Sequence, residues 1–249
     1  MGTGSSGGAR GSAGGGGLVA KSPIDLTDAQ AEALKDRFES GFDSATKKSI
    51  EKYISRDAID SKSHSLSQTM NFLISRGEDL DSVTASELNS KYDLGITQRD
   101  VAAMRKTSKN IDAAMHDLGI DANLQRGAHA GQFSTMFGIS DFSSMSESQL
   151  KKKMVGQTFK NTAVWSTSYD VGKNPFLSEK SSVSGGREVV YRIKAGSGTK
   201  CVFGAMDQAE IILGKGTNFR VTNVAFTGKT AKPKSGGTIK QIVVDLETF

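Results

Sequence analysis

The hydrophobic period changes once along this chain, and that change limits the folds available to it. Between Pro23 and about Leu118 the apolar residues recur at the spacing of an amphipathic helix. From Gln157 onward, short apolar or alternating runs are separated by turns rich in Gly, Ser and Lys, which is typical of strands. Helices followed by a run of strands predict an α+β fold with a mixed or antiparallel sheet.

Several helix starts are marked by a Thr that stands three positions before an acid or an amide, the pattern of a capping box. These pairs are Thr27 with Gln30, Thr84 with Glu87, and Thr97 with Asp100. The helix that begins after Thr97 is expected to continue to Leu118 and to stop at Gly119. The remaining helices are expected around Ile50–Ile54, Leu66–Ile74 and Ala130–Phe137, and after Ser146.

The β-rich part and the domain organisation follow from the same reasoning. The expected strands are Leu124–Gly127, Phe159–Ser168, Arg187–Lys194, Lys200–Gly204, Glu210–Leu213, Thr217–Phe226 and Thr238–Leu246. Residues 1–22 are rich in Gly, Ser and Ala and are expected to form a flexible tail. Residues 23–249 are expected to form one domain, with a helical portion at 23–118 and a β-rich core at 119–249.

Composition argues against several classes of protein. The net charge of +5 would attract phosphates or acidic surfaces, but no nucleic-acid-binding motif accompanies it, so no nucleic-acid partner is expected. Cys201 is the only cysteine and is expected to be a buried small hydrophobe; together with three scattered histidines it offers no zinc pattern. No apolar run approaches the roughly 18 residues of a membrane span, and no signal peptide is visible. We therefore expect a soluble monomer.

The most informative short segment is Gln208-Ala209-Glu210, which leads into an apolar run. On an extended strand, residues two apart point to the same face, so Gln208 and Glu210 would lie side by side. An amide and a carboxylate beside apolar neighbours are costly unless they have a partner, which suggests a binding site. Taken alone, however, the segment is better explained as the solvated end of an edge strand.

Two upstream segments change that interpretation. In chain order the three segments are Arg126-Gly127, Ser166-Thr167-Ser168 and Gln208-Ala209-Glu210. Together they resemble the Arg, S-T-S and Q-x-E signatures of the mono-ADP-ribosyltransferase toxins, and most nearly those of the Rho-modifying clostridial exoenzymes. The resemblance covers roughly Ile111 to Phe249, and the preceding helices fit the family's helical N-terminal portion. It implies the ADP-ribosyltransferase fold, with NAD as co-substrate and no metal.

The resemblance implies cofactor-binding roles for the first two segments. Arg126 would bind the phosphate oxygens of NAD, and Gly127 would let the cofactor approach the backbone. Ser166, Thr167 and Ser168 would brace the strand, the ribose and the catalytic carboxylate with their hydroxyl groups. Each of these residues, taken singly, is also an ordinary strand residue.

The third segment would carry the chemistry. Glu210 would accept a hydrogen bond from a ribose hydroxyl and stabilise the positive charge that develops as the bond to nicotinamide breaks. Gln208 would meet the acceptor side chain. Relatives with Glu at this position usually modify arginine, and those with Gln resemble the asparagine-modifying exoenzymes, so an asparagine acceptor is expected first.

Two loops complete the implied site. The acceptor-facing segment comprises Phe203, Gly204, Ala205, Met206 and Asp207. In the loop between Tyr169 and Gly186, Phe176 could stack on nicotinamide, and Arg187 at its end could bind a phosphate. The acceptor-facing segment departs from the Rho-modifying exoenzymes, whose aromatic residue lies closer to the Gln than Phe203 does here, so the resemblance does not fix the protein acceptor.

Alternative functions remain open on the sequence. The expected partners are NAD and a protein acceptor, for example a host regulatory protein such as a small GTPase. Water as the acceptor would make the chain an NAD glycohydrolase. Loss of activity would leave a structural or binding module of a phage particle or toxin complex. Without a visible signal peptide, secretion by another route and carriage in a phage particle are both compatible with the sequence.

Overall fold

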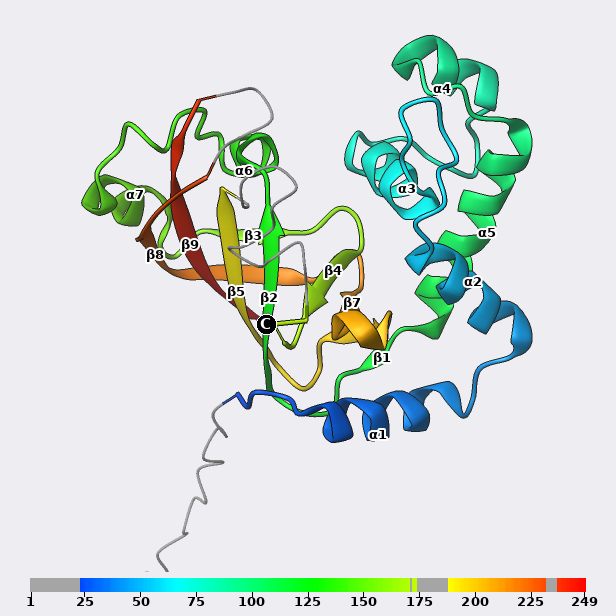
Figure 1. The fold of residues 1–249 in the computed structure, drawn as a ribbon, viewed down its shortest axis with the longest axis horizontal. Coiled ribbons are helices and arrows are strands. Elements are labelled where there is room, and N and C mark those ends of the chain that lie inside the picture. The colour runs from blue at the N-terminus through cyan, green and yellow to red at the C-terminus, as the bar shows by residue number, and fades with distance from the viewer. Residues whose placement is uncertain (1–22, 171, 174–187, 232–236) are drawn as a thin grey trace, which may run out of the picture.

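The computed structural model of the chain describes residues 23–170, 172–173, 188–231 and 237–249. Within these ranges the protein contains helices α1–α7 and one nine-stranded mixed sheet, which confirms the α+β prediction. Figure 1 shows α2–α5 on one side of the sheet, α6 and α7 on the other, and α1 along the lower edge. The predicted tail lies outside the described residues.

The helical portion begins where the capping pattern predicts. Its helices are α1 (Asp28–Glu39), α2 (Ser44–Ile54), α3 (Leu66–Ser75), α4 (Ala85–Tyr92) and α5 (Gln98–Ala114). Thr27, Thr84 and Thr97 each accept a hydrogen bond from the backbone N–H three positions later, and the side chain at that position accepts one in return from the Thr N–H. Reciprocal bonds of this kind satisfy N–H groups that the first helical turn leaves unpaired. The three predicted capping boxes are confirmed.

The end of α5 differs from the prediction. The helix stops at Ala114 instead of Leu118, because Met115 has an extended backbone and the chain enters the short strand β1 (His116–Asp117). This strand pairs with the edge of the sheet, and the N–H of Leu118 donates to the carbonyl of Thr199 at 2.9 Å. Leu118 therefore fits the helical spacing of apolar residues in the sequence, but in the structure its backbone is hydrogen-bonded at the edge of the sheet. Pairing with a distant strand overrode the local helical pattern.

The sheet has the order β1-β6-β7-β4-β2-β5-β9-β8-β3, and its described strand pairs are antiparallel except for β5 with β9. The strands after β1 are β2 (Ala122–Ala128), β3 (Thr158–Lys160), β4 (Trp165–Ser168), β5 (Val189–Ala195), β6 (Lys200–Phe203), β7 (Glu210–Leu213), β8 (Asn218–Ala231) and β9 (Ile239–Thr248). Two helices, α6 (Ala130–Phe137) and α7 (Glu147–Met154), connect β2 to β3. The predicted α6 and β7 have the observed bounds.

One predicted strand is in fact two. The segment 159–168 was expected to be continuous, but β3 pairs with β8 at the far edge, whereas β4 lies between β7 and β2 in the middle of the sheet. Asn161 makes the break possible: its buried side-chain amide donates to the carbonyls of Ala163 and Gly214, both at 2.9 Å. Those bonds satisfy carbonyl groups that a strand would otherwise pair.

Two hydrophobic cores lie on opposite faces of the central strands. Ile211 and Leu213 of β7 belong to the core shared with α1, α6 and α7. Ile212, between them, belongs to the core shared with α2–α5. Alternate residues of a strand point to opposite faces, so this short strand is buried on both sides. Cys201 of β6 is also buried and unpaired, as predicted, and burial raises the pKa of its thiol to about 12.

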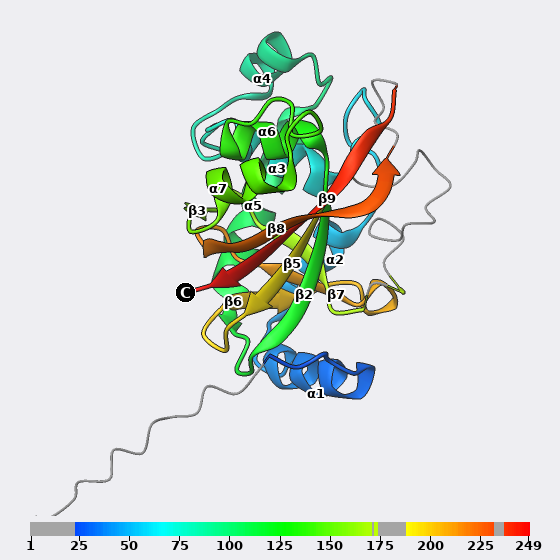
Figure 2. The ribbon, with the colours of Figure 1, turned by 90° about the vertical axis from the view of Figure 1, so that its left-hand side faces the viewer.

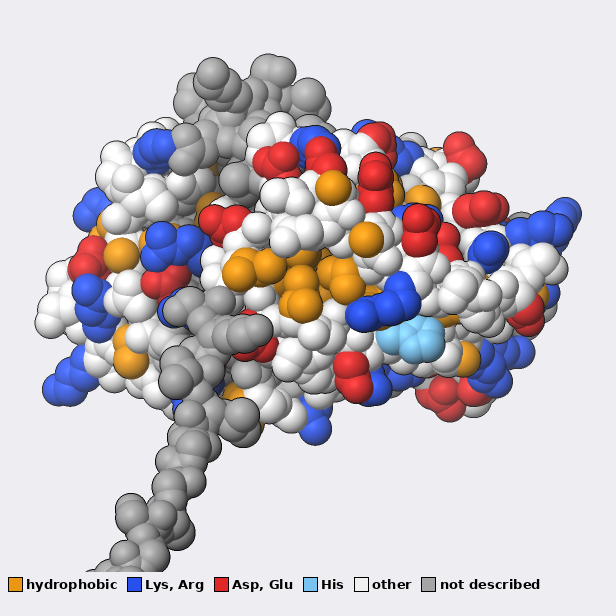
Figure 3. Space-filling view, turned by 90° about the horizontal axis from the view of Figure 1, so that it is seen from below, with side chains coloured by type: hydrophobic (Ala, Val, Ile, Leu, Met, Phe, Trp, Pro, Cys, Tyr) orange, Lys and Arg blue, Asp and Glu red, His pale blue; other side chains and the backbone are white. Residues whose placement is uncertain are grey.

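Helix α1 lies below the sheet in both perpendicular views (Figures 1 and 2). Its Phe38 ring contacts that of Phe203 with ring centroids 5.6 Å apart, which ties the helix to β6. Seen from this side, the surface carries hydrophobic side chains near its centre with charged groups around them (Figure 3). None of the described helices is long and apolar enough to span a bilayer.

The turn at Asn161 yields a first prediction. Asn161→Ala removes the amide donor of the buried Ala163 carbonyl and leaves the Gly214 carbonyl with the Thr217 hydroxyl, so it should lower the free energy of unfolding by about 1–2 kcal/mol. The matched control is Gln157→Ala, because the Gln157 amide donates to the carbonyl of Lys153 on the exposed surface; it should cost less than about 0.5 kcal/mol. Denaturant unfolding of both variants measures the difference, and equal costs would contradict the proposed role of Asn161.

Candidate active site

The three sequence segments lie on three neighbouring strands, β7, β4 and β2. Glu210 at the start of β7 is the cross-strand partner of Ser168 at the end of β4. Ser168 in turn pairs with Gln125 of β2, the residue before Arg126. Adjacent strands lie about 4.8 Å apart. The pairing therefore brings Arg126 and Glu210, which are more than 80 residues apart in the sequence, to the same end of the central strands.

The residue pair at 208 and 210 has a different geometry from the one expected. Residues Met206–Gln208 form a short 3₁₀ turn, and Ala209 has a left-handed backbone with φ of 50°. Only Glu210 is on the strand, so the alternation of an extended chain does not place the Gln208 side chain. Gln208 belongs to the turn, where it is partly exposed beside the exposed Asp207.

The expected acceptor-facing segment is shorter in the structure than in the prediction. Phe203 lies on β6, and its side chain is only 2% exposed because it packs against α1. Gly204 is also buried. The residues of this segment that solvent reaches are Ala205, Met206 and Asp207. The prediction that Phe203 faces the acceptor is therefore wrong, because the apolar β6–α1 contact takes its ring into the core.

The side chain of Glu210 is partly exposed and folds back over the hairpin that β6 and β7 form. Its Oε2 accepts a hydrogen bond from the N–H of Ala205 at 3.1 Å. The backbone closes the same loop, because the N–H of Gly204 donates to the Glu210 carbonyl and the N–H of Glu210 donates to the Ala205 carbonyl, both at 3.0 Å. The turn therefore holds the carboxylate at the end of the sheet.

Arg126 is held from two sides. Its Nη1 donates to the backbone carbonyl of Ser166 at 2.8 Å, which links β2 to β4. The guanidinium carbon lies 5.1 Å from the centre of the Trp165 ring, within the range of a cation–π contact. Trp165 stacks in turn on Tyr191, the cross-strand partner of Arg126. These two contacts orient the guanidinium, a group whose planar fork can bind phosphate oxygens in a bidentate way.

The hydroxyl groups of the S-T-S segment brace the strands. Thr167 Oγ1 donates to the carbonyl of Ile211 at 2.7 Å, and Ser168 Oγ donates to the carbonyls of Asp170 and Gln208 at 2.8 and 3.2 Å. Both side chains are buried, whereas Ser166 is partly exposed. The expected bracing of the strand is present in these contacts, and Ser166 is the member of the segment that a ligand could reach.

Tyr53 of α2 is a residue of this site that sequence reasoning missed. Its ring is 1% exposed, and its hydroxyl accepts a hydrogen bond from the Asn71 amide at 2.9 Å. Burial raises the pKa of the Tyr53 hydroxyl; hydrogen bonds with Asn71 and Ser166 oppose that rise, and the charges of Glu210 and Arg126 also act on it. The sequence shows Tyr53 only as part of an apolar stripe, although a buried tyrosine hydroxyl usually has a polar partner.

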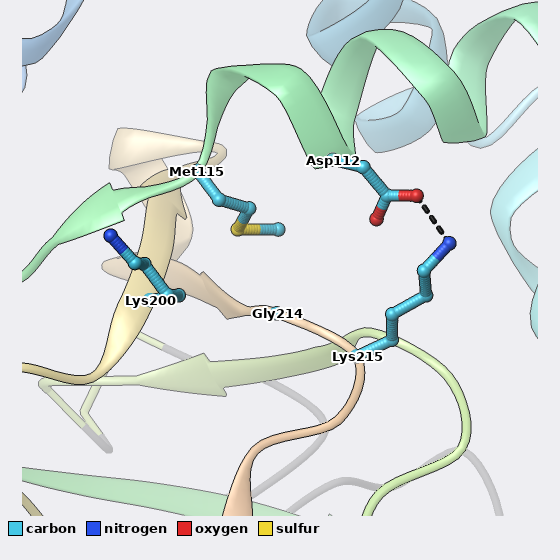
Figure 4. A pocket seen from close by; sticks show the side chains of 5 residues that line it. All are labelled: Asp112, Met115, Lys200, Gly214 and Lys215. Atoms are coloured by element: carbon cyan, nitrogen blue, oxygen red, sulfur yellow. Dashed lines mark hydrogen bonds and ion pairs between the residues drawn. The ribbon is translucent and has the colours of Figure 1, made fainter.

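Two residues of the implied site, Phe176 and Arg187, lie outside the described residues. A separate shallow hollow lies at the other end of β7, lined by Asp112, Met115, Lys200, Gly214 and Lys215 (Figure 4). Its charges are paired, Lys215 with Asp112 and Lys200 with Asp117. It does not include any of the three segments.

Comparison with known proteins agrees with this geometry. The family model described as ADP-ribosyltransferase exoenzyme matches residues 28–249. Among curated proteins, a sequence comparison gives no match. Among solved structures, Plx2a, an ADP-ribosyltransferase toxin from Paenibacillus larvae, is similar with a TM-score of 0.60 and 16% identity, over 91% of this chain and 98% of that one.

Two further structures show the same fold. C3stau2 from S. aureus, solved with NAD, has a TM-score of 0.57 and 14% identity, over 92% of this chain and 99% of that one. The enzymatic component C2-I of the C2 toxin from Clostridium botulinum has a TM-score of 0.58 and 16% identity over 90% of this chain. The match spans 48% of C2-I, so the chain corresponds to about half of that protein. With the family model covering nearly its whole length, the chain belongs to the ADP-ribosyltransferase exoenzyme family.

Proposed function

We propose that the chain is an NAD-dependent mono-ADP-ribosyltransferase that modifies a protein side chain, with asparagine as the acceptor. The observation that carries the proposal is the placement of Arg126, Ser166 and Glu210 on three adjacent strands at one end of the sheet. Family membership supports the reaction class. The acceptor residue rests on Gln208 alone.

The side chains present fit NAD by their chemistry. NAD combines an anionic pyrophosphate with a ribose that becomes positively charged as its bond to nicotinamide breaks. Among the described residues, the site offers the Arg126 guanidinium for the first and the Glu210 carboxylate for the second. Arg126 donates to the carbonyl of Ser166, and Ser168 on the same strand is the cross-strand partner of Glu210, so the two charged residues lie at the same end of the sheet.

The division of labour follows from these charges. When bound, NAD supplies the ADP-ribose unit and nicotinamide as the leaving group. Arg126 orients the phosphates, and Ser166 lies beside it on β4. Glu210 accepts a hydrogen bond from a ribose hydroxyl, and this bond strengthens as positive charge develops on the sugar. A fixed charge that binds the transition state more tightly than the ground state accelerates the reaction.

The acceptor meets the turn between β6 and β7. Gln208 is partly exposed on this turn, and its amide can pair with an asparagine amide without the cost of burying a charge. Met206 and Asp207 precede it in the turn and would contact the protein that carries the acceptor. The family resemblance suggests a host regulatory protein, for example a small GTPase, as the protein that carries the acceptor.

Glu210→Gln tests the catalytic role. The substitution keeps the size of the side chain and removes its charge, so we expect transfer of labelled ADP-ribose from NAD to protein in a cell lysate to fall on the order of 100- to 1000-fold. Glu32→Gln, on the exposed face of α1, is the matched control and should leave the rate unchanged. Labelling by the Glu210 variant at the wild-type rate would remove Glu210 from the mechanism.

The acceptor residue is tested separately. We expect mass-spectrometric mapping of the labelled protein to find ADP-ribose on asparagine, because the acceptor-facing residue of the turn is an amide. A modified arginine would contradict that expectation while leaving the transferase intact. Release of nicotinamide without labelled protein would instead identify an NAD glycohydrolase. Failure of millimolar NAD to raise the melting temperature would favour a binding or structural role.

A further inference from the structure

Gly204, at the end of β6, has a Glu210 carboxylate where its side chain would be. A Cβ on Gly204 would lie 2.2 Å from Glu210 Oε2, 2.7 Å from Cδ and 2.9 Å from Cγ. These separations are well inside van der Waals contact, which for carbon atoms begins near 3.5 Å. The backbone φ of Gly204 is not in the left-handed region. A glycine is therefore needed at 204 because the Glu210 side chain occupies the space of a Cβ, and not because of the backbone conformation.

The surrounding hydrogen bonds leave the backbone of Gly204 and of Glu210 little freedom to move. Phe203, before Gly204, pairs with Ile211, after Glu210. The two intervening N–H···O bonds, Gly204 to Glu210 and Glu210 to Ala205, close the hairpin at 3.0 Å each. Strands that are paired and buried on both faces resist displacement, so a new methyl group would move the flexible carboxylate and not the strand.

We propose that Gly204 is a positioning residue for Glu210: the bare backbone at 204 lets the carboxylate lie flat on the hairpin and accept the Ala205 N–H. The inference rests on the proposed function, in which Glu210 acts on the ribose. The turn between β6 and β7 then has two roles. Its exposed residues face the acceptor, and the N–H of Ala205 at its start holds the catalytic carboxylate.

Gly204→Ala tests this role. The added methyl group pushes the carboxylate away from the Ala205 N–H, so we expect kcat for nicotinamide release from NAD to fall roughly 10- to 100-fold, as for a misplacement of about 1 Å. KM for NAD should change by less than about twofold, because the binding residues on β2 and β4 are untouched. This split separates a positioning effect from a general loss of structure.

Gly214→Ala is the matched control at the other end of β7. A Cβ there would meet its nearest neighbour, Met115 Sδ, at 3.4 Å, an ordinary contact, and the backbone φ again lies outside the left-handed region. The control should keep the wild-type kcat. A Gly204→Ala enzyme with wild-type kcat would overturn the proposal, and so would an equal loss in Gly214→Ala.

A spectroscopic readout tests the contact independently of activity. In the wild-type background, Glu210→Gln should move the amide proton resonance of Ala205 upfield, because a hydrogen bond to a carboxylate is stronger than one to an amide oxygen. In the Gly204→Ala background the same substitution should leave that resonance where it is, while in the Gly214→Ala background it should move it as in the wild type. An effect of Glu210→Gln that persists in the Gly204→Ala background, or that is absent from the wild-type background, refutes the positioning role. A wild-type chain that releases no nicotinamide refutes the proposed function, and the Ala205 resonance still decides the role of Gly204.

Discussion

The antiparallel pairing of β4 with β7 is the interaction on which the rest of the site depends. Ile211 and Ile212 of β7 are fully buried on opposite faces of the sheet, so the strand cannot slide without opening one of the two cores. Thr167 adds a side-chain bond from β4 to the β7 backbone. Glu210 is the first residue of this strand, which is buried on both faces, so the backbone that carries its partly exposed side chain is held in place.

The helical portion contributes Tyr53 of α2 to the surroundings of the site, in addition to one of the two hydrophobic cores. Tyr53 comes from α2, yet its hydroxyl lies among Asn71 of α3 and the charged and polar groups of the central strands. Burying a hydroxyl there is tolerable because the Asn71 amide donates a hydrogen bond to it at 2.9 Å. The helices therefore fix the position of the S-T-S strand, and substitutions in their core that move Tyr53 would reach the site without touching any of its three segments.

The sequence predicted what is local and missed what depends on distant partners. Capping boxes such as Thr97–Asp100 join residues three apart, so their pattern is readable in the chain. The end of α5 depends on Thr199, which accepts from Leu118 across the sheet edge, and no local pattern reports that contact. The burial of Phe203 likewise depends on Phe38, which is far away in sequence. The three functional segments were recognised because residue type and order identify them without their geometry.

The turn at 205–209 shows why the geometry still matters for function. Ala209 adopts a left-handed backbone that costs a residue with a side chain on the order of 1–3 kcal/mol, and its methyl group is fully buried in the core. Burial and the N–H···O bond from Ala209 to Met206 at 3.0 Å offset that cost. The bend lifts Gln208 off the strand while Glu210 stays on it. The Gln208 amide therefore lies on a turn, where it can adjust to the acceptor, whereas the sheet fixes the position of the Glu210 carboxylate.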